Sequence, residues 1–138
     1  MDLAELIEFV RARGLGVLAS RGPSGSPQAA LVGIAATDQG ELVFDCSRRS
    51  RKYANIERDP SVALVVGWDD EVTVQIEGRA EVLGGEDLER CKAFYFKQYP
   101  DGQGRAESPE IVHIRFTPQW LRYSDYRPAT FGSSEAHF

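Results

Sequence analysis

The chain has 138 residues, of which 42% are hydrophobic and 27% charged, and its net charge is −5. This composition is typical of one globular domain, and it excludes collagen-like and low-complexity chains. The negative charge argues against a general nucleic-acid binder, and no stretch has the roughly 20 apolar residues of a membrane span. The first residues are acidic, and Cys46 and Cys91 have no metal-binding or redox spacing. We therefore expect a cytoplasmic protein with free thiols, no bound metal and no nucleic-acid or membrane partner.

The first part of the chain predicts one helix followed by three strands. Apolar residues recur at helical spacing in residues 2–13, which indicates a helix that ends at Gly14. Apolar runs over Leu15–Ser20 and Pro27–Thr37 flank a turn rich in Gly, Pro and Ser, so they predict a hairpin. A further strand is expected at Glu41–Cys46.

The middle of the chain predicts a short helix and two longer strands. Residues 50–58 are expected to be helical and to end before Asp59, because a residue that precedes proline avoids the helical region. The apolar run Ser61–Trp68 predicts a buried strand. Strict alternation over Val72–Leu83 predicts a strand with one apolar and one polar face.

The last part predicts a helix, a polar loop and a final strand. Residues 86–98 carry acids at their start and an apolar stripe, as a helix does. The loop is expected at Pro100–Pro109, and the strand at Glu110–Tyr123 with an interruption at Pro118. The tail from Arg127 is expected to be irregular.

Six strands joined mostly as hairpins favour one antiparallel sheet. Closure of such a sheet into a barrel removes its exposed edges. The expected fold class is therefore mainly β, a six-stranded barrel with short helices. We expect a single domain over residues 1–138, with its core at about residues 3–126.

The segment Ser47-Arg-Arg-Ser-Arg-Lys52 carries four positive charges and no negative one. Its second half opens the predicted helix 50–58, and the first turn of a helix has free N–H groups that attract anions. With the hydroxyl of Ser50 and the cations of Arg51 and Lys52, this site suits a phosphate monoester. The alternative is a solvated basic loop balanced by nearby acids, and charge alone slightly favours that alternative.

Two further groups of side chains could contact a flat ligand. Thr73, Gln75 and Glu77 share the polar face of the strand Val72–Leu83, and an amide there can pair with the edge of a heterocycle. Trp120 and Tyr123 could stack on such a ligand. By themselves, a plain solvent face and a core or subunit interface are the better interpretations.

No side-chain arrangement in the sequence indicates nucleophilic or acid–base catalysis. The two histidines, His113 and His137, have no neighbour at metal-ligand spacing. Nucleotide-binding glycine motifs are also missing. If the protein is an enzyme, its reactive atoms therefore belong to a bound cofactor, and we assign no catalytic side chain.

Taken in order, these features resemble the pyridoxamine 5′-phosphate oxidase-like family of FMN-binding split β-barrels, over roughly residues 3–126. The most specific segment is Leu42–Ile56, in which Ser-Arg-Lys opens a helix after a strand, followed by Asp59–Val65. The segments Thr73–Ala80 and Pro118–Asp125 are similar to two later strands of the family.

The resemblance implies a six-stranded split barrel that works as a homodimer, with FMN in clefts between the subunits. It places the cofactor phosphate at Arg51 and Lys52 with Ser50 beside them. The strand backbone at Asp45 and Cys46 would run beside the flavin. The segment Gln28–Val32 would lie along the flavin ring. The other residues implied as cofactor contacts are Gln28, Ala30, Leu31, Val32, Thr73, Gln75 and Trp120.

A dimer also has support from the apolar pattern. The strand Val62–Val66, the aromatic end of the last strand and the helix 86–98 offer more apolar surface than a small barrel buries.

The sequence departs from the family where the vitamin substrate binds. True pyridoxamine phosphate oxidases carry an Arg and a His one residue apart after the last strand, whereas here Arg127 precedes Pro128. The first interpretation is therefore an FMN-dependent oxidoreductase for another small molecule. The alternatives are a non-catalytic flavin carrier, sensor or stress-response module, and a deazaflavin-dependent reductase.

Overall fold

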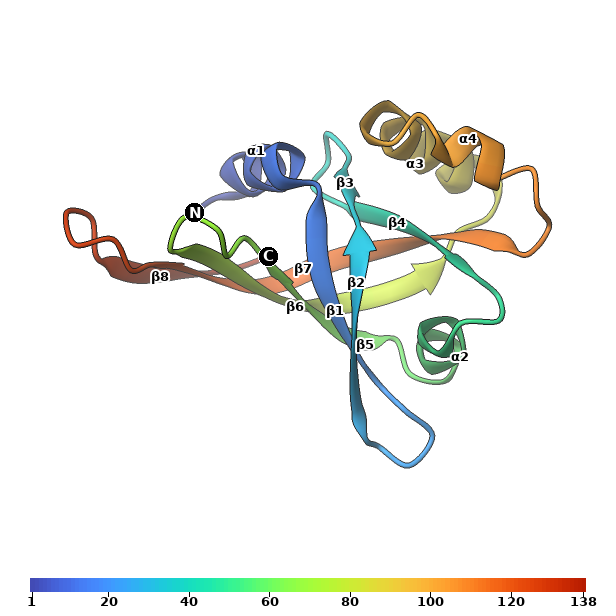
Figure 1. Cartoon of the computed structure of the whole chain (residues 1–138), viewed down its shortest axis with the longest axis horizontal. Helices are drawn as coiled ribbons and strands as arrows, with labels where there is room; N and C mark the ends of the chain where they lie inside the picture. Colours follow the sequence, from blue (N-terminus) through green and yellow to red (C-terminus); the bar gives the residue numbers. More distant parts are fainter.

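The computed structural model describes residues 1–138, and its centre is one curled antiparallel sheet with helices around it (Figure 1). The strands are β1 (Leu15–Arg21), β2 (Pro27–Gly33), β3 (Ala35–Ala36), β4 (Leu42–Ser47), β5 (Ser61–Val66), β6 (Val72–Val82), β7 (Ile111–Asp125) and β8 (Gly132–His137). The helices are α1 (Leu3–Arg13), α2 (Arg51–Arg58), α3 (Gly85–Gln98) and α4 (Gly102–Arg105). The fold is mainly β, as the sequence predicts. Ile34 divides the expected strand Pro27–Thr37 into β2 and β3, and β8 is added to the six expected strands.

The order of the strands explains why the sheet curls. Hydrogen-bonded neighbours follow the order β2-β1-β5-β6-β7-β4-β3, with β8 beside β7. The strands β2 and β3 stand at opposite ends of this order, yet only Ile34 separates them in the chain. The sheet must therefore bend until its two ends approach each other, which produces the expected split barrel.

The predicted helices form, and their capping residues mark where they begin and end. At the start of α1, the side chains of Asp2 and Glu5 each accept a hydrogen bond from the other's backbone N–H, and Gly14 ends the helix at φ +71°. The longest helix, α3, has 14 residues. None of the helices has both the length and the apolarity needed to cross a membrane.

The core lies inside the curl of the sheet. The alternation in β6 turns Val74 and Ile76 inward, where they are fully buried, and leaves Gln75 and Glu77 exposed. The largest buried side chains are Phe44, Phe116, Leu6, Leu18, Ile34, Leu42, Leu64, Ile76, Ile114 and Leu121. The central strands and α1 thus share one apolar core.

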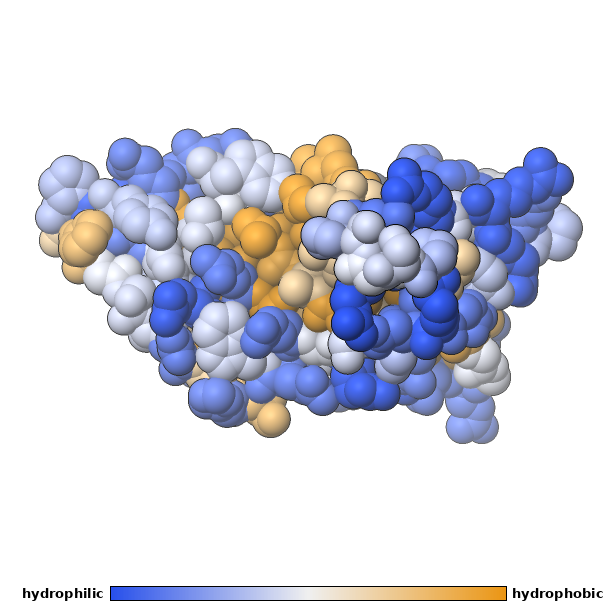
Figure 2. Space-filling model, turned by 90° about the horizontal axis from the view of Figure 1, so that it is seen from below, coloured by the Kyte–Doolittle hydropathy of each residue, from blue (hydrophilic) through white to orange (hydrophobic).

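The convex side of the sheet, which we call the outer face, changes from apolar to polar across its strands. One row of paired residues runs from Leu31 through Val17 and Val65 to Gln75 and Arg122. Leu31 is 62% exposed and Val65 is 38% exposed. Apolar surface bordered by polar residues is visible on one side of the molecule in Figure 2. The single chain therefore leaves an apolar area uncovered on β2, β1 and β5.

Two features of the last third differ from the sequence-based expectation. Pro118 does not interrupt the final strand: Gly78 pairs with Pro118 and Glu77 with Trp120, so Gln119 is an unpaired bulge residue. A bulge accommodates a proline because it removes the need for a ladder N–H. The loop Pro100–Pro109 contains the short helix α4.

The tail is not irregular, which corrects a further expectation. Residues from Gly132 form β8, which pairs with β7 from Trp120 to Asp125. The turn between them is held by Asp125, whose carboxylate accepts bonds from the backbone and guanidinium of Arg127 and from the hydroxyl of Thr130. These bonds hold the pKa of Asp125 well below its usual range. The strand itself is exposed and polar, so it has no apolar pattern that could predict it.

Candidate functional site

A cleft of about 300 Å³ lies where the β1–β2 hairpin meets the start of α2. Across the hairpin, Leu18 pairs with Ala30 and Ser20 pairs with Gln28, so these side chains share one side of the two strands. The lining residues are Leu18, Ser20, Gln28, Ala29, Ala30, Arg51 and Lys52. The fold thus brings together four residues predicted as cofactor contacts, namely Gln28, Ala30, Arg51 and Lys52.

The start of α2 supplies unpaired positive charge to this cleft. Arg51 is exposed and Lys52 half-buried, and neither side chain has an ion-pair or hydrogen-bond partner in the chain. Their backbone N–H groups, in the first turn, also have no acceptor. The hydroxyl of Ser50 is already used, because it accepts from the N–H of Tyr53 at 3.3 Å and donates to the carbonyl of Ser47 at 2.7 Å. Ser50 is therefore the N-cap that starts the helix, and the cations beside it remain free for an anion.

A buried amide fastens α2 to the hairpin. Asn55 is 2% exposed, and its Nδ2 lies 3.0 Å from Oγ of Ser20 and 2.8 Å from Oε1 of Gln28. Its Oδ1 accepts a bond of 2.9 Å from Arg58. These contacts hold the start of α2 against β1 and β2, and so they fix the walls of the cleft.

Asp45 and Cys46 do not line the cleft. The carboxylate of Asp45 pairs with Arg105 of α4 at 3.0 Å. Cys46 is buried, and burial raises the pKa of its thiol, so it is not a reactive thiolate. The expected passage of the flavin along the backbone of these two residues stays a prediction.

The remaining predicted contacts lie elsewhere on the sheet. Val32 is buried in the core, whereas Leu31 points to the outer face. Thr73, Gln75 and Trp120 lie on the outer face of β6 and β7, and none of the three lines the cleft. A single chain therefore does not bring them to Arg51 and Lys52, and their contact with a cofactor stays a prediction.

Sequence reasoning missed three residues of this region: Leu18, Ser20 and Asn55. Two of them could have been found from the hairpin register, because Leu18 and Ser20 lie opposite Ala30 and Gln28. Asn55 carried a weaker signal, as a polar residue one turn after Arg51 on the buried side of its helix.

The comparison with known proteins decides the family. The model of the family described as pyridoxamine 5′-phosphate oxidase matches residues 3–125, nearly the whole chain. The chain belongs to the pyridoxamine 5′-phosphate oxidase family. Its cationic cleft at the Ser-Arg-Lys helix start lies within the matched residues.

Members and structural neighbours of the family differ in what they are named for. A pyridoxine/pyridoxamine 5′-phosphate oxidase from Burkholderia lata is 36% identical over 86 residues, which cover 62% of this chain and 38% of that protein. A heme binding protein from Mycobacterium smegmatis shares the fold with a TM-score of 0.82 at 18% identity, covering 99% of this chain and 58% of that one. The General Stress Protein 26 from Bacillus anthracis matches with a TM-score of 0.75 at 23% identity, over 100% of both chains. This family member thus spans well under half the length of the curated relatives it matches.

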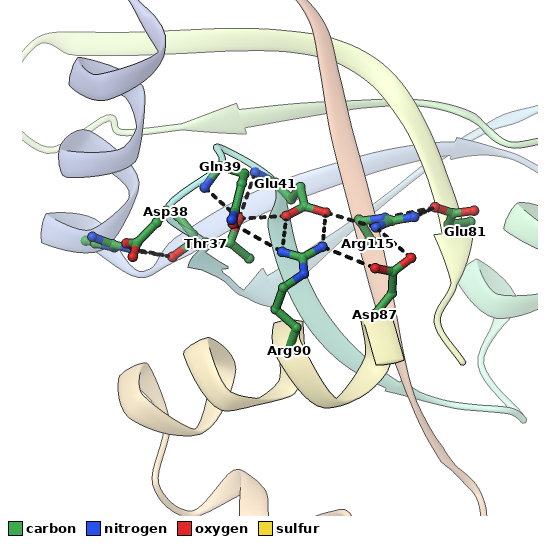
Figure 3. A network of polar contacts seen from close by, with 10 residues as sticks. Thr37, Asp38, Gln39, Glu41, Glu81, Asp87, Arg90 and Arg115 are labelled. Carbon is green, nitrogen blue, oxygen red and sulfur yellow. Dashed lines mark hydrogen bonds and ion pairs between the residues drawn. The ribbon is translucent and has the colours of Figure 1, made fainter. Parts of the chain in front are cut away.

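A second pair of cations in this oxidase-family chain, Arg90 and Arg115, is fully paired (Figure 3). The carboxylate of Glu41, only 13% exposed, accepts two bonds from Arg90 at 2.6 and 2.8 Å and one from Arg115 at 2.9 Å. The hydroxyl of Thr37 donates to it at 2.9 Å, and Asp87 lies 3.3 Å from Arg115. Mainly through the bond from Arg90, the pKa of Glu41 falls to about 2. This network joins α3 to the β3–β4 turn and to β7, and it leaves neither arginine free for a ligand.

His113, the only histidine on the predicted strands, is a core residue of this family member. It is buried beneath α3, with the rings of Tyr95 and Phe96 each 5.6 Å away, and its Nε2 has no hydrogen-bond partner. Burial lowers its pKa, although the charge of Asp45 acts in the opposite direction. His113 is not among the residues that line the cleft.

Proposed function

We propose that this chain binds FMN, with the cofactor phosphate in the cleft at the start of α2, and acts as an oxidoreductase on a small molecule. The observation that carries the proposal is the pair of free cations, Arg51 and Lys52, beside two free backbone N–H groups. These groups fit a phosphate monoester, which presents only acceptor oxygens and negative charge. A bound flavin supplies hydride and electron transfer, chemistry that no side chain of this cleft can perform.

The chain's own residues would bind and orient the cofactor. Arg51 and Lys52 would neutralise the phosphate, and the small side chain of Ala30 leaves room beside them. At about 300 Å³, the cleft is at the lower end of ligand sites, which span roughly 300–1,000 Å³. One chain would therefore cover only part of the cofactor.

A second copy of the chain would supply the rest. Leu31 and Val65 lie on either side of Val17 in one row of the outer face and are both exposed, and pairing two such faces about a two-fold axis would bury them. Thr73, Gln75 and Trp120 lie at the polar end of the same face, so they would approach the cofactor from the partner. The apolar side of α3 does not contribute to this surface, because it packs against its own sheet through Cys91 and Tyr95.

A non-catalytic flavin module is the second candidate. The stress protein from Bacillus anthracis matches this chain over the full length of both, whereas the Burkholderia oxidase extends well beyond the matched region. In addition, Arg127 pairs with Asp125 to close the β7–β8 turn, so it is not free to contact a substrate. Reduction by a nicotinamide donor with turnover of an acceptor would distinguish an oxidoreductase from a carrier.

The test is a spectrum of the purified protein before and after FMN is added. A flavin spectrum that stays with the protein through gel filtration supports the proposal. Riboflavin serves as the control ligand, and we expect it to bind at least tenfold more weakly because it lacks the phosphate. Equal affinity for the two compounds, binding of a deazaflavin alone, or a heme spectrum in place of a flavin spectrum would each overturn it.

A further inference from the structure

The polar side chains beside the cleft form a chain of hydrogen bonds with a single direction. The chain of bonds begins at Arg58, whose guanidinium can only donate. This guanidinium also donates to the carbonyl of Arg21 at 2.8 Å. Because Arg58 donates to Oδ1 of Asn55, the NH₂ group of Asn55 must face the other way, towards the hairpin. The orientation of the Asn55 amide is therefore decided by a residue that cannot accept a hydrogen bond.

The wall of the cleft is constrained in the same way. The NH₂ group of Asn55 needs acceptors, and it finds Oε1 of Gln28 at 2.8 Å and Oγ of Ser20 at 3.0 Å. Gln28 must then present its own NH₂ group at its free end, and that group has no acceptor within the chain. Gly22 leaves the space for it, since a Cβ at that position would lie 2.6 Å from Nε2 of Gln28.

We infer that Asn55 is a positioning residue, which fixes Gln28 as a hydrogen-bond donor and makes the cleft selective for a group that only accepts. The hydroxyl of Ser20 accepts a hydrogen bond from Asn55, so its own O–H remains able to donate to a group in the cleft. Together with Arg51 and Lys52, every polar side chain in the lining can donate, and no carboxylate is among them. This inference rests on the proposed function, in which the acceptor group is the phosphate of FMN.

The first test is a double-mutant cycle on FMN affinity with Asn55→Asp and Gln28→Leu. An aspartate at position 55 can only accept, so Gln28 must turn its NH₂ group towards it and expose its oxygen to the cleft. We expect Asn55→Asp to weaken FMN binding about tenfold more in the presence of Gln28 than in the Gln28→Leu background. Asn55→Asp adds the same negative charge in both backgrounds. The Gln28→Leu background therefore controls for simple repulsion between this charge and the phosphate. Equal losses in the two backgrounds would overturn the inference.

The second test needs no cofactor, so it separates this inference from the proposed function. Side-chain amide hydrogen exchange, measured by NMR on the ligand-free protein, should be slower for Asn55 than for Gln28. Inorganic phosphate should then shift the Gln28 amide signals. If the wild-type protein binds no FMN but both NMR results hold, the proposed function fails and the inference stands. Protected Gln28 protons, or Gln28 signals that phosphate leaves unchanged, would overturn it.

Discussion

Two regions of this molecule use pairs of cationic side chains in opposite ways. Around Glu41, the guanidinium groups of Arg90 and Arg115 are each held by carboxylates from other elements, and the cluster joins α3 to the sheet (Figure 3). At the start of α2, Arg51 and Lys52 have no acidic partner at all. Cations that carry their own counter-ions stabilise the fold, whereas unpaired cations at a helix start remain available to an external anion.

The comparison also explains why charge alone could not identify the site. Both regions contain two cationic side chains and a serine or threonine hydroxyl. The deciding difference is the position of Glu41, which enters the cluster from the β3–β4 turn. No acidic side chain enters the cleft in that way.

The largest expected effect comes from removing the unpaired cations. The double substitution Arg51→Ala with Lys52→Ala should weaken FMN binding by about 3–6 kcal/mol, because two charge-assisted hydrogen bonds to phosphate are lost. Fluorescence titration with FMN measures the change. Arg48→Ala with Arg49→Ala is the matched control, since it removes the same charge from outside the cleft. A similar loss in both double variants would show that only the general positive potential matters.

The next effect concerns the paired region. Glu41→Gln should lower the free energy of unfolding by about 2–4 kcal/mol, because Arg90 and Arg115 lose a nearly buried partner. Urea denaturation measures it. Glu110→Gln, which breaks the exposed pair with Arg49, should change stability by about 1 kcal/mol or less. If the folded Glu41→Gln protein bound FMN much more weakly than the wild type, the contrast between the two regions would be wrong.

The same carboxylate predicts a pH dependence of stability. The pKa of Glu41 is about 2 in the folded protein against 4.5 ordinarily, so its contribution is fully present above pH 4.5. That contribution is lost as the pH falls from 4.5 towards 2, because the unfolded chain takes up the proton first. Urea denaturation at several pH values across this window gives the free energy of unfolding as a function of pH. The slope of this free energy against pH should be smaller for Glu41→Gln than for the wild type. Identical slopes for variant and wild type would contradict the assignment.

A third change tests whether the outer face pairs two chains. Leu31→Glu places a charge in the exposed apolar row, and we expect it to weaken self-association by about 2–3 kcal/mol while the chain stays folded. Light scattering after gel filtration measures the mass. The control is Phe131→Glu, an exposed aromatic in the turn before β8. A wild-type monomer, or loss of the dimer in the control alone, would exclude pairing through this face.

The smallest effect is expected at the buried histidine. His113→Phe should change stability by about 1 kcal/mol or less at neutral pH, because Nε2 of His113 has no partner to lose. The folded-state pKa of His113 lies below 6.5, so the wild type should lose stability as the pH falls from 6.5 through that pKa. Between pH 7 and pH 5, the melting temperature should decrease less for His113→Phe than for the wild type. A large loss of stability at pH 7 would reveal a bond that Nε2 does make.

Local signals in the sequence determined most of the helices, the hairpin and the start of α2. The capping box at Asp2, the left-handed Gly14 and the alternation of β6 act over a few neighbouring residues, so a reader of the sequence can find them. The Ser-Arg-Lys helix start also belongs to this group. These signals were sufficient to predict that Arg51 and Lys52 open a helix, whereas the anion site there was implied by the family resemblance and stays a prediction.

Only the tertiary structure decided which residues meet. Glu41 and Arg115 are 74 positions apart, and Asn55 is 27 positions from Gln28, so their contacts depend on strand order and register rather than on any local pattern. The same holds for β8, a polar strand that exists because it pairs with the free edge of β7. The ends of a helix or a turn are set mainly by neighbours in the chain, whereas the pairing of a charge depends on the residues that the fold brings beside it.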